Sequence, residues 1–375
     1  MSEAPFLRRV ALSWARSVEL SPRRVWPVVR ELGGVEAALA APEAQLAQGL
    51  RSAERARALL RSADDREAER WAADLERAGI SIVTAFDDSY PSALAEIADP
   101  PFLLFTSGNL ARLKLPAVAI VGSRGASRYG REVAFRLARD LSLAGVCVVS
   151  GFARGVDTAA HDAAREGPGG TIAVLGCGLD VDYPRENARL KETLRPDHLI
   201  VSEYPPGEEP RAGNFPIRNR IIAGISAGVV VVEASRRSGS LITARLAADF
   251  GRDVFAVPGS VFSETSVGAH ELLRDGAILC RGAEDVLAEL FPAVGGPAGL
   301  PAAPPAGARL DLSTEARALL STLAREGTAS ADELAQEADL PAATVLAALF
   351  ELEAAGLARE TGAGRYGLSG GPVAQ

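Results

Sequence analysis

The sequence predicts an α/β protein built around a doubly wound parallel sheet, with a helical domain before the sheet and a winged-helix-like domain after it. Three observations support this prediction. From residue 80 onward, short β-branched runs alternate with helical stretches, as in successive βαβ units. These runs are apolar without alternation, as expected of strands that helices cover on both faces. The chain is also long enough, at 375 residues and 47% hydrophobic, for two or three domains.

Residues 1–84 predict a helical domain. Leu, Val and Ala recur at three-to-four spacing through residues 26–41 and 55–79. The run LSPRRVWPVVRELGGVEAAL resembles a helix-hairpin-helix or SAM-like module, and a plain helical adaptor is an equally good interpretation.

Residues 85–291 predict the sheet domain. Its strands are expected at AVAIV (117–121), VCVVS (146–150), TIAVL (171–175), LIVS (199–202), VVVVE (229–233) and DVFAV (253–257). Residues 292–308 are rich in Pro, Gly and Ala, which indicates a semi-rigid linker. In the last domain, residues 309–375, three helical stretches precede the hairpin pattern GLARETGAGRYGLS, which favours a winged helix-turn-helix.

The composition limits the function classes. No apolar run approaches the roughly 18 to 20 residues of a membrane span, and no signal-like segment opens the chain, so we expect a cytoplasmic protein with no membrane contact. Three scattered cysteines without a CxxC pair, and three histidines, make a metal site unexpected. The net charge is −8, so any nucleic-acid contact must come from a local basic cluster.

Small residues follow the predicted strands at the edge where an open parallel sheet binds its ligands. The strand ends read Gly122-Ser123-Arg124, Ser150-Gly151, Gly176-Cys177-Gly178 and Pro258-Gly259. Small residues let backbone N–H groups approach an anion, and Arg124 adds a charged fork beside the next helix. The sequence therefore predicts a phosphate site, although any single glycine could merely turn the chain. The spacings GxGxxG and GxxxxGK[ST] are absent, which disfavours a nicotinamide enzyme or a P-loop ATPase.

A basic cluster lies between residues 211 and 237, where five arginines accompany a single acid, Glu233. Phe215 within this cluster offers a face on which a base could stack, as in proteins that bind single strands. Two alternatives stay open at this point. Phe215 could be a core aromatic, and Arg218 and Arg220 could form internal salt bridges.

The chain resembles the DNA-processing protein A (DprA/Smf) family over about 170 residues. The segments that carry the resemblance are, in the family's order, AIVGSRGASRYG, VVSGFARGVDTAAHDAA, AVLGCGLDVDYPRENARL, SEYPPGEEPRAGNFPIRNRIIAGIS, VVVVEASRRSGSLITARLAADFGRDVFAVPG and LLRDGA. The resemblance implies an extended Rossmann-like fold and binding of single-stranded DNA. It also implies a homodimer that delivers a RecA-type recombinase onto incoming DNA in natural transformation, with no cofactor and no catalytic activity.

The resemblance also assigns residues to the site. The phosphate-binding GSR of the family falls on Gly122, Ser123 and Arg124, and its FPxRNR motif falls on Phe215, Pro216, Arg218, Asn219 and Arg220. The expected binding site is completed by Ser150, Gly151, Arg211, Ser238, Gly239 and Ser240. Where relatives often carry a basic residue this chain has Ala212, for which Arg211 could substitute. His270 stands where relatives usually have Asn, and its role stays open.

Two further sets of residues suggest catalysis or ligand binding, but each also has a structural explanation. Asp157 and His161 are spaced i, i+4, which favours capping and bracing of a helix over acid–base catalysis. Ser238-Gly239-Ser240 precedes a helical stretch and is expected to cap it, even if it also contacts phosphate.

The C-terminal domain is acidic, with ten acids and five arginines between residues 309 and 365, so a role in protein contact or dimer support is favoured over DNA binding. Two other functions remain as alternatives. The chain could be an enzyme of the related Rossmann-like branch that hydrolyses nucleoside phosphates, but RRSGSLITARLA lacks the glutamate of that branch. A duplex-DNA transcription factor acting through the C-terminal domain is the weaker alternative.

Overall fold

The computed structural model describes residues 3–17, 20, 22–292, 313–354, 357–362 and 365–368. The chain divides into two compact units, Met1–Pro301 and Ala302–Gln375, and each contains its own hydrophobic core. The predicted linker lies outside the described residues from residue 293 onward. The predicted boundary at residue 84 stays a prediction, because the helical segment before it packs against the sheet within the first unit.

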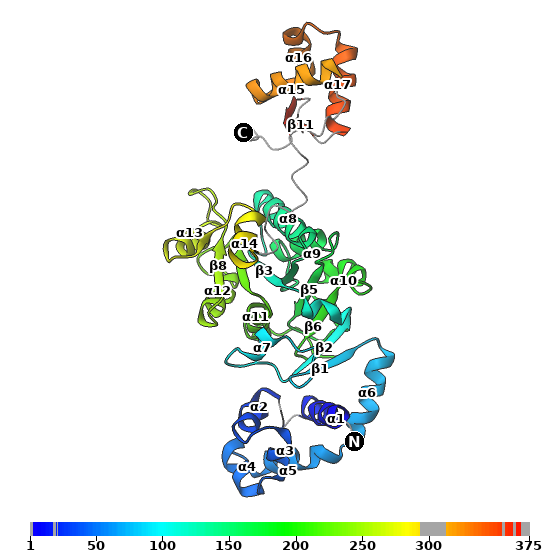
Figure 1. Ribbon diagram of the computed structural model, residues 1–375, viewed down its shortest axis with the longest axis vertical. Coiled ribbons are helices and arrows are strands. Elements are labelled where there is room, and N and C mark those ends of the chain that lie inside the picture. The colour runs from blue at the N-terminus through cyan, green and yellow to red at the C-terminus, as the bar shows by residue number, and fades with distance from the viewer. Residues whose placement is uncertain are drawn as a thin grey trace. The chain divides into compact units, whose positions relative to one another are not determined.

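A nine-stranded sheet forms the centre of the first unit, in the order β1-β2-β6-β5-β4-β3-β7-β8-β9 (Figure 1). Its strands are β1 (Ser81–Thr84), β2 (Leu103–Gly108), β3 (Ala117–Val121), β4 (Cys147–Ser150), β5 (Thr171–Leu175), β6 (Leu199–Ser202), β7 (Gly228–Val231), β8 (Asp253–Ala256) and β9 (Ile278–Leu279). All neighbouring strands in the part of the sheet that reads β6-β5-β4-β3-β7-β8-β9 run parallel to one another. Strands β2 and β1 add an antiparallel edge beside β6. The doubly wound sheet is confirmed and every expected run forms a strand, whereas β1, β2 and β9 were not predicted.

The order of the strands reverses at β3. The chain first adds β4, β5 and β6 on one side of β3, and then returns to place β7, β8 and β9 on the other side. Val121 at the end of β3 is therefore in register with Val231 of β7. Because the loops after β3 and β7 diverge at this point, they open a crevice at the carboxyl edge of the sheet.

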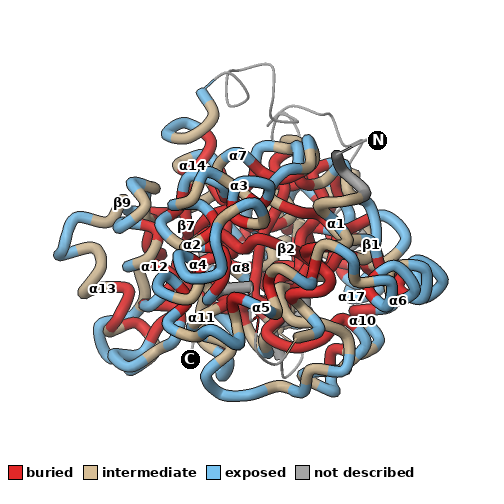
Figure 2. Tube along the Cα trace, turned by 90° about the horizontal axis from the view of Figure 1, so that it is seen from below, coloured by how far each residue is buried: buried red, intermediate tan, exposed pale blue. Residues whose placement is uncertain are grey.

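Helices cover both faces of the sheet. In Figure 2 the buried residues, in red, gather in the interior and the exposed ones, in pale blue, lie mostly at the outside. One face is covered by α8 (Arg128–Leu143), α9 (Val156–Ala164) and α14 (Ala283–Leu290). The other face is covered by α7 (Ser92–Ala95), α11 (Asn214–Ile225) and α12 (Ser240–Asp249). The remaining helices, α10 (Ala188–Leu194) and α13 (Val267–Arg274), follow β5 and β8. Apolar strands are thus buried on both sides, as the sequence predicts.

The N-terminal segment is helical, as predicted. Its helices are α1 (Glu3–Arg16), α2 (Pro22–Glu31), α3 (Val35–Ala40), α4 (Glu43–Leu50), α5 (Ala53–Arg61) and α6 (Arg66–Arg77). The rings of Trp14 and Trp26 pack against Phe102, beside β2, at centroid distances of 4.7 and 4.6 Å. These aromatic contacts, worth about 0.5 to 1.5 kcal/mol each beyond burial, join the helices to the antiparallel edge of the sheet.

The second unit contains α15 (Thr314–Glu326), α16 (Ala331–Ala338) and α17 (Ala342–Ala354). Its sheet is β10-β12-β11, formed by β10 (Thr328–Ser330), β11 (Ala358–Gly362) and β12 (Arg365–Leu368). Ser330 and Glu333 form a capping box that fixes the start of α16. Three helices and a hairpin are the predicted winged-helix pattern. Over the described part of both units, we find no helix with the length and hydropathy of a membrane span.

Candidate functional site

A cleft of about 590 Å³ opens at the carboxyl edge of the sheet, where the order of the strands reverses. It is lined by the loops after β3, β4 and β7 and by the first turns of α11 and α12. Of the residues expected at the site, those that line it are Gly122, Ser123, Arg124, Gly151, Phe215, Arg218, Asn219, Ser238, Gly239 and Ser240. The fold therefore brings together residues that are up to 118 positions apart in the sequence, from Gly122 to Ser240.

Glycines allow the loops to pack closely beneath the cleft. A Cβ atom on Gly122 would lie 2.6 Å from the side chain of Val156 on α9, and one on Gly151 would lie 2.8 Å from the guanidinium of Arg218. Gly155 has a φ of +79° and passes close under the Ser123 carbonyl. These contacts place Arg124 on an exposed loop above a packed floor.

Two buried charged residues, Asp157 and Arg218, lie in that floor. The Asp157 carboxylate accepts hydrogen bonds from the backbone N–H groups of Gly151 and Ala153, at 3.1 and 3.2 Å. Arg218, which is 4% exposed, donates from Nη1 to the carbonyls of Gly151, at 2.6 Å, and Val174. Burial raises the pKa of Asp157 to about 6, against the opposing effect of Arg218, and burial lowers the pKa of Arg218 to about 10.

Ser150 lies in this floor and not in the cleft. It is fully buried, and its hydroxyl donates to the carbonyl of Ile120 in the neighbouring strand at 2.6 Å. Its contribution is to hold β4 beside β3, so the expectation that it contacts the ligand is corrected.

Two aromatic side chains, Phe215 and Tyr183, lie between the cleft and a second cavity beside it. The ring of Phe215 lies against Gly176, whose hypothetical Cβ would be 2.9 Å from the ring, and the guanidinium of Arg124 lies 5.4 Å from its centroid. The ring of Tyr183 also packs against Phe215, with centroids 5.3 Å apart and ring planes tilted by 34°. Sequence analysis missed Tyr183. The sequence feature that could have indicated it is the position of this aromatic residue in DVDYPREN, the segment that follows a glycine-rich strand end.

The first turns of α11 and α12 face the cleft without side-chain caps. The N-cap of α12 is Gly239, within the Ser238-Gly239-Ser240 run expected to cap it, and the Ser238 hydroxyl accepts the backbone N–H of Ser240 at 3.4 Å. The Ser238 hydroxyl also lies 2.7 Å from the hydroxyl of Ser240, and the Asn219 amide donates to the Gly239 carbonyl at 3.3 Å. Backbone N–H groups at a helix start attract anions.

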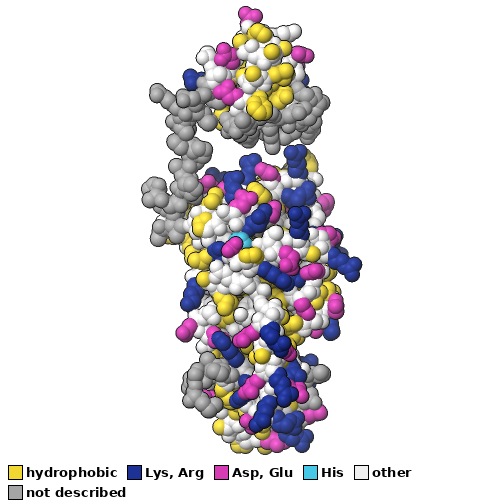
Figure 3. Space-filling model, turned by 90° about the vertical axis from the view of Figure 1, so that its right-hand side faces the viewer, with side chains coloured by type: hydrophobic (Ala, Val, Ile, Leu, Met, Phe, Trp, Pro, Cys, Tyr) yellow, Lys and Arg dark blue, Asp and Glu magenta, His cyan; other side chains and the backbone are white. Residues whose placement is uncertain are grey.

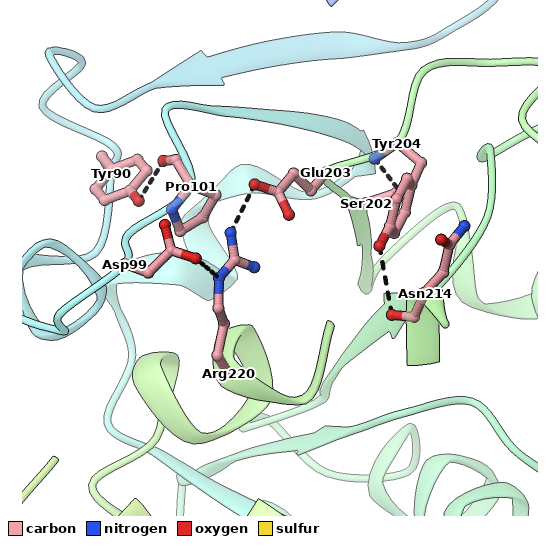
Figure 4. Close-up of polar contacts among 8 residues, drawn as sticks. All are labelled: Tyr90, Asp99, Pro101, Ser202, Glu203, Tyr204, Asn214 and Arg220. Atoms are coloured by element: carbon pink, nitrogen blue, oxygen red, sulfur yellow. Dashed lines mark hydrogen bonds and ion pairs between the residues drawn. The ribbon is translucent and has the colours of Figure 1, made fainter. Parts of the chain in front are cut away.

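Arg220 lies outside the cleft. It is buried, and its Nη2 donates to Glu203, directly after β6, at 2.6 Å and its Nε to Asp99 at 3.1 Å (Figure 4). The Glu203 side chain is only 6% exposed, so this is an internal salt bridge. Tyr90 closes the same region by donating to the Pro101 carbonyl at 2.6 Å. The expectation that Arg220 faces the ligand is therefore corrected, and the alternative of internal salt bridging holds for it.

Arg211 does not line the cleft either. Its side chain is 72% exposed and lies 3.3 Å from Glu208. Ala212, beside it, does line the cleft, with no charge to offer.

His161 and His270 make contacts within the protein that fit structural roles. His161 is fully buried, its Nδ1 lies 2.7 Å from the Thr171 hydroxyl, and burial lowers its pKa to about 3, so it is neutral. His270 lies 3.1 Å from the Gly259 carbonyl in the loop after β8. Asp157 braces the loop before α9, as described above. In the part of the chain that the structure describes, no three His, Cys, Asp or Glu side chains gather into a metal site.

Charges of both signs are interspersed on the face shown in Figure 3, so this face carries no broad basic surface. Many arginines elsewhere are paired at the surface, as Arg136 is with Glu132 at 2.7 Å. Among the described residues, the arginines that line the cleft itself are Arg124 and Arg218.

Comparison with known proteins places two parts of the chain in families. Residues 81–291 match the family described as DNA recombination-mediator protein A, and residues 301–364 match the DprA winged helix domain, which confirms the predicted winged helix. DNA processing protein DprA of Streptococcus pneumoniae is 53% identical over 203 residues, which cover 54% of this chain and 72% of that protein. A putative DNA processing protein DprA of Mycobacterium tuberculosis is 39% identical over 368 residues, covering 93% of this chain and 92% of that protein.

Comparison with solved structures also finds proteins called DNA processing protein A. The X-ray structure of DNA processing protein A from Streptococcus pneumoniae matches with a TM-score of 0.65 and 40% identity, over 77% of this chain and 97% of that chain. A structure described as showing the single-stranded DNA binding mode of DNA processing protein A from Helicobacter pylori matches with a TM-score of 0.52 and 31% identity, over 57% of this chain and 96% of that chain.

Replacing Arg220 by Ala should destabilise the first unit. The change leaves Glu203 buried without its cation, which typically costs about 3 to 5 kcal/mol. Arg236→Ala is the matched control, because Arg236 is 76% exposed in its pair with Glu271 and such pairs contribute about 0 to 1 kcal/mol. Urea unfolding of both variants provides the measurement. Equal shifts of the two unfolding midpoints would contradict the structural role of Arg220.

Proposed function

We propose, from the premise that this chain belongs to the DNA recombination-mediator protein A family, that it binds single-stranded DNA along the cleft at the end of β3. The single observation that carries the proposal is the position of Arg124. Its guanidinium is exposed and lies 5.4 Å from the Phe215 ring, so a cation for a phosphate and an aromatic face for a base lie side by side.

Two features of the cleft suit a phosphate backbone. The starts of α11 and α12 present backbone N–H groups, and the serines at 238 and 240 add hydroxyl donors. Arg218 lies in the floor and holds the loop after β4 in place by donating to the Gly151 carbonyl. None of these contacts distinguishes one base from another, since phosphate contacts position a strand without reading its sequence. We therefore expect binding with little sequence preference.

The cellular role that we propose follows from the family. Members act in DNA processing and recombination, and we propose that this protein protects incoming single-stranded DNA and loads a RecA-type recombinase on it during natural transformation. A homodimer in the cytoplasm is part of the same proposal.

We propose that the cleft has no catalytic role. Asp157 is the one carboxylate that lines it, and this group already accepts two backbone hydrogen bonds and faces the charge of Arg218. His161, the nearest histidine in the sequence, is neutral and does not line the cleft. A hydrolase needs a base or nucleophile that can reach its substrate.

The C-terminal domain is proposed as a surface for protein contact. Helix α17 contains no Lys or Arg, and it exposes Leu346 and Phe350, which are 53% and 73% exposed. An apolar helix in an acidic domain is poorly suited to grip a polyanion.

Arg124→Ala should weaken binding of single-stranded DNA strongly without unfolding the protein, because the side chain is exposed and contributes little to the core. The loss of one phosphate contact should lower the slope of log affinity against log salt by roughly 0.7. Phe215→Ala should cost on the order of 1 to 3 kcal/mol through lost stacking and leave that slope nearly unchanged. Fluorescence anisotropy over a range of salt concentrations measures both effects. An Arg124→Ala variant that binds like wild type, with an unchanged melting transition, would place the site elsewhere.

Removal of residues 292–375 should leave most of the affinity for single-stranded DNA intact, since the cleft lies wholly in the first unit and the deleted domain is acidic. The truncated and complete proteins are compared by the same anisotropy titration. Circular dichroism verifies that the truncated protein is folded. A folded truncation whose affinity falls by orders of magnitude would sink the assignment of binding to the first unit.

Purified protein should release no free base from nucleoside monophosphates above a blank, because the cleft holds no available base or nucleophile. Chromatography of the reaction mixture over a long incubation measures the release. Base release that Arg124→Ala abolishes would favour the alternative function, an enzyme acting on nucleoside phosphates.

A further inference from the structure

We infer that a second cavity, beside the cleft, binds a further nucleotide of the same strand, with Tyr183 as its stacking surface and Arg154 and Arg185 at its rim. The inference rests on the proposed function and extends it by one subsite. The cavity measures about 360 Å³, within the range of about 300 to 1,000 Å³ that is typical of small-molecule sites.

The two cavities form one continuous path. Arg124, Tyr183 and Phe215 line both of them, so these side chains form the wall between the two. The path crosses the ends of the adjacent strands β7, β3, β4 and β5. At a strand spacing of about 4.8 Å it extends for about 14 Å. This is several times the rise of about 3.4 Å per nucleotide in a stacked strand, so the path has room for more than one nucleotide.

Tyr183 is the more accessible of the two aromatic rings. Phe215 is half-buried against Gly176, Arg124 and Tyr183, so only part of its ring is open to a base. Tyr183 is 38% exposed. A base cannot lie between the two rings at their separation of 5.3 Å, because each stacked contact needs about 3.5 to 4.0 Å. A further base therefore stacks on the exposed surface of Tyr183, a residue that lines the second cavity as well as the cleft.

The charges at the second cavity favour a phosphate. Arg154 and Arg185 are exposed at its rim, and Glu186 is the one carboxylate that lines it. Arg154 lies 3.6 Å from Glu186, with both side chains more than half exposed. Such a pair is weak, so a DNA phosphate competes with Glu186 for the guanidinium. With Arg124 in the shared wall, cations outnumber acids at this cavity.

The test is a titration of the full-length protein with oligothymidylates of increasing length, at several salt concentrations. Wild-type affinity should rise with length until both cavities are filled. Tyr183→Ala should keep the affinity for the shortest oligomer that binds and lose about 5- to 150-fold for the longer ones, the fold-change that corresponds to one stacked base. Tyr183→Phe should behave like wild type, because its ring stacks equally well. Arg185→Gln should lower the salt slope by roughly 0.7 for the longer oligomers only.

Two matched controls separate this effect from general ones. Phe350→Ala removes an aromatic side chain that is 73% exposed in the other unit, and Arg136→Gln removes a surface arginine paired on α8. Both should bind every oligomer as wild type does. A Tyr183→Ala variant that equals wild type at every length, or that loses the same factor at every length, overturns the second subsite alone. A wild-type protein that binds none of the oligomers overturns the proposed function and the subsite together.

Discussion

The buried guanidinium of Arg218 holds together the elements that shape the cleft. It donates to the carbonyls of Gly151 and Val174, at the ends of β4 and β5, and its charge is balanced by Asp157 on α9. A buried cation that lost these partners would cost several kcal/mol, so the register of the strands, the turn into α9 and the placement of α11 are fixed together. Phe215 and Asn219, on the same helix as Arg218, are thereby held at the mouth of the cleft.

The arginines of α11 show where sequence analysis reaches its limit. The five arginines between residues 211 and 237 predicted a binding segment, and Arg218 is the one among them that lines the cleft. The pattern did not predict which side chains face the ligand. Residues two positions apart on a helix point about 200° apart, so Arg218 and Arg220 cannot both face the cleft. The acids that hold Arg220, Asp99 and Glu203, are 121 and 17 residues distant in sequence, and no local pattern connects them.

The fold was more predictable than the site, for a physical reason. A strand buried on both faces needs an unbroken apolar run, and each such run in the sequence became a strand of the sheet. Strand β1 at the edge is partly exposed and β2 pairs in the antiparallel direction, so neither follows the βαβ pattern by which the others were recognised. Tyr183 was missed for a related reason. It lies in an irregular segment after β5, where no periodicity exists and only the folded chain brings it to Phe215.

An acidic protein can bind a polyanion when its few relevant cations are held in place before the ligand arrives. Surface arginines lose side-chain freedom when they bind phosphate, at about 0.5 to 1.5 kcal/mol for each immobilised side chain. Arg124 already rests near the face of Phe215, which in turn packs against Gly176 and Tyr183, so part of that loss has occurred in the free protein. A cation–π contact at an exposed site contributes only about 0.5 to 1 kcal/mol, which orients the guanidinium without hiding its donors from phosphate. The same ring therefore has two effects, because it offers a surface to a base and positions the cation beside it.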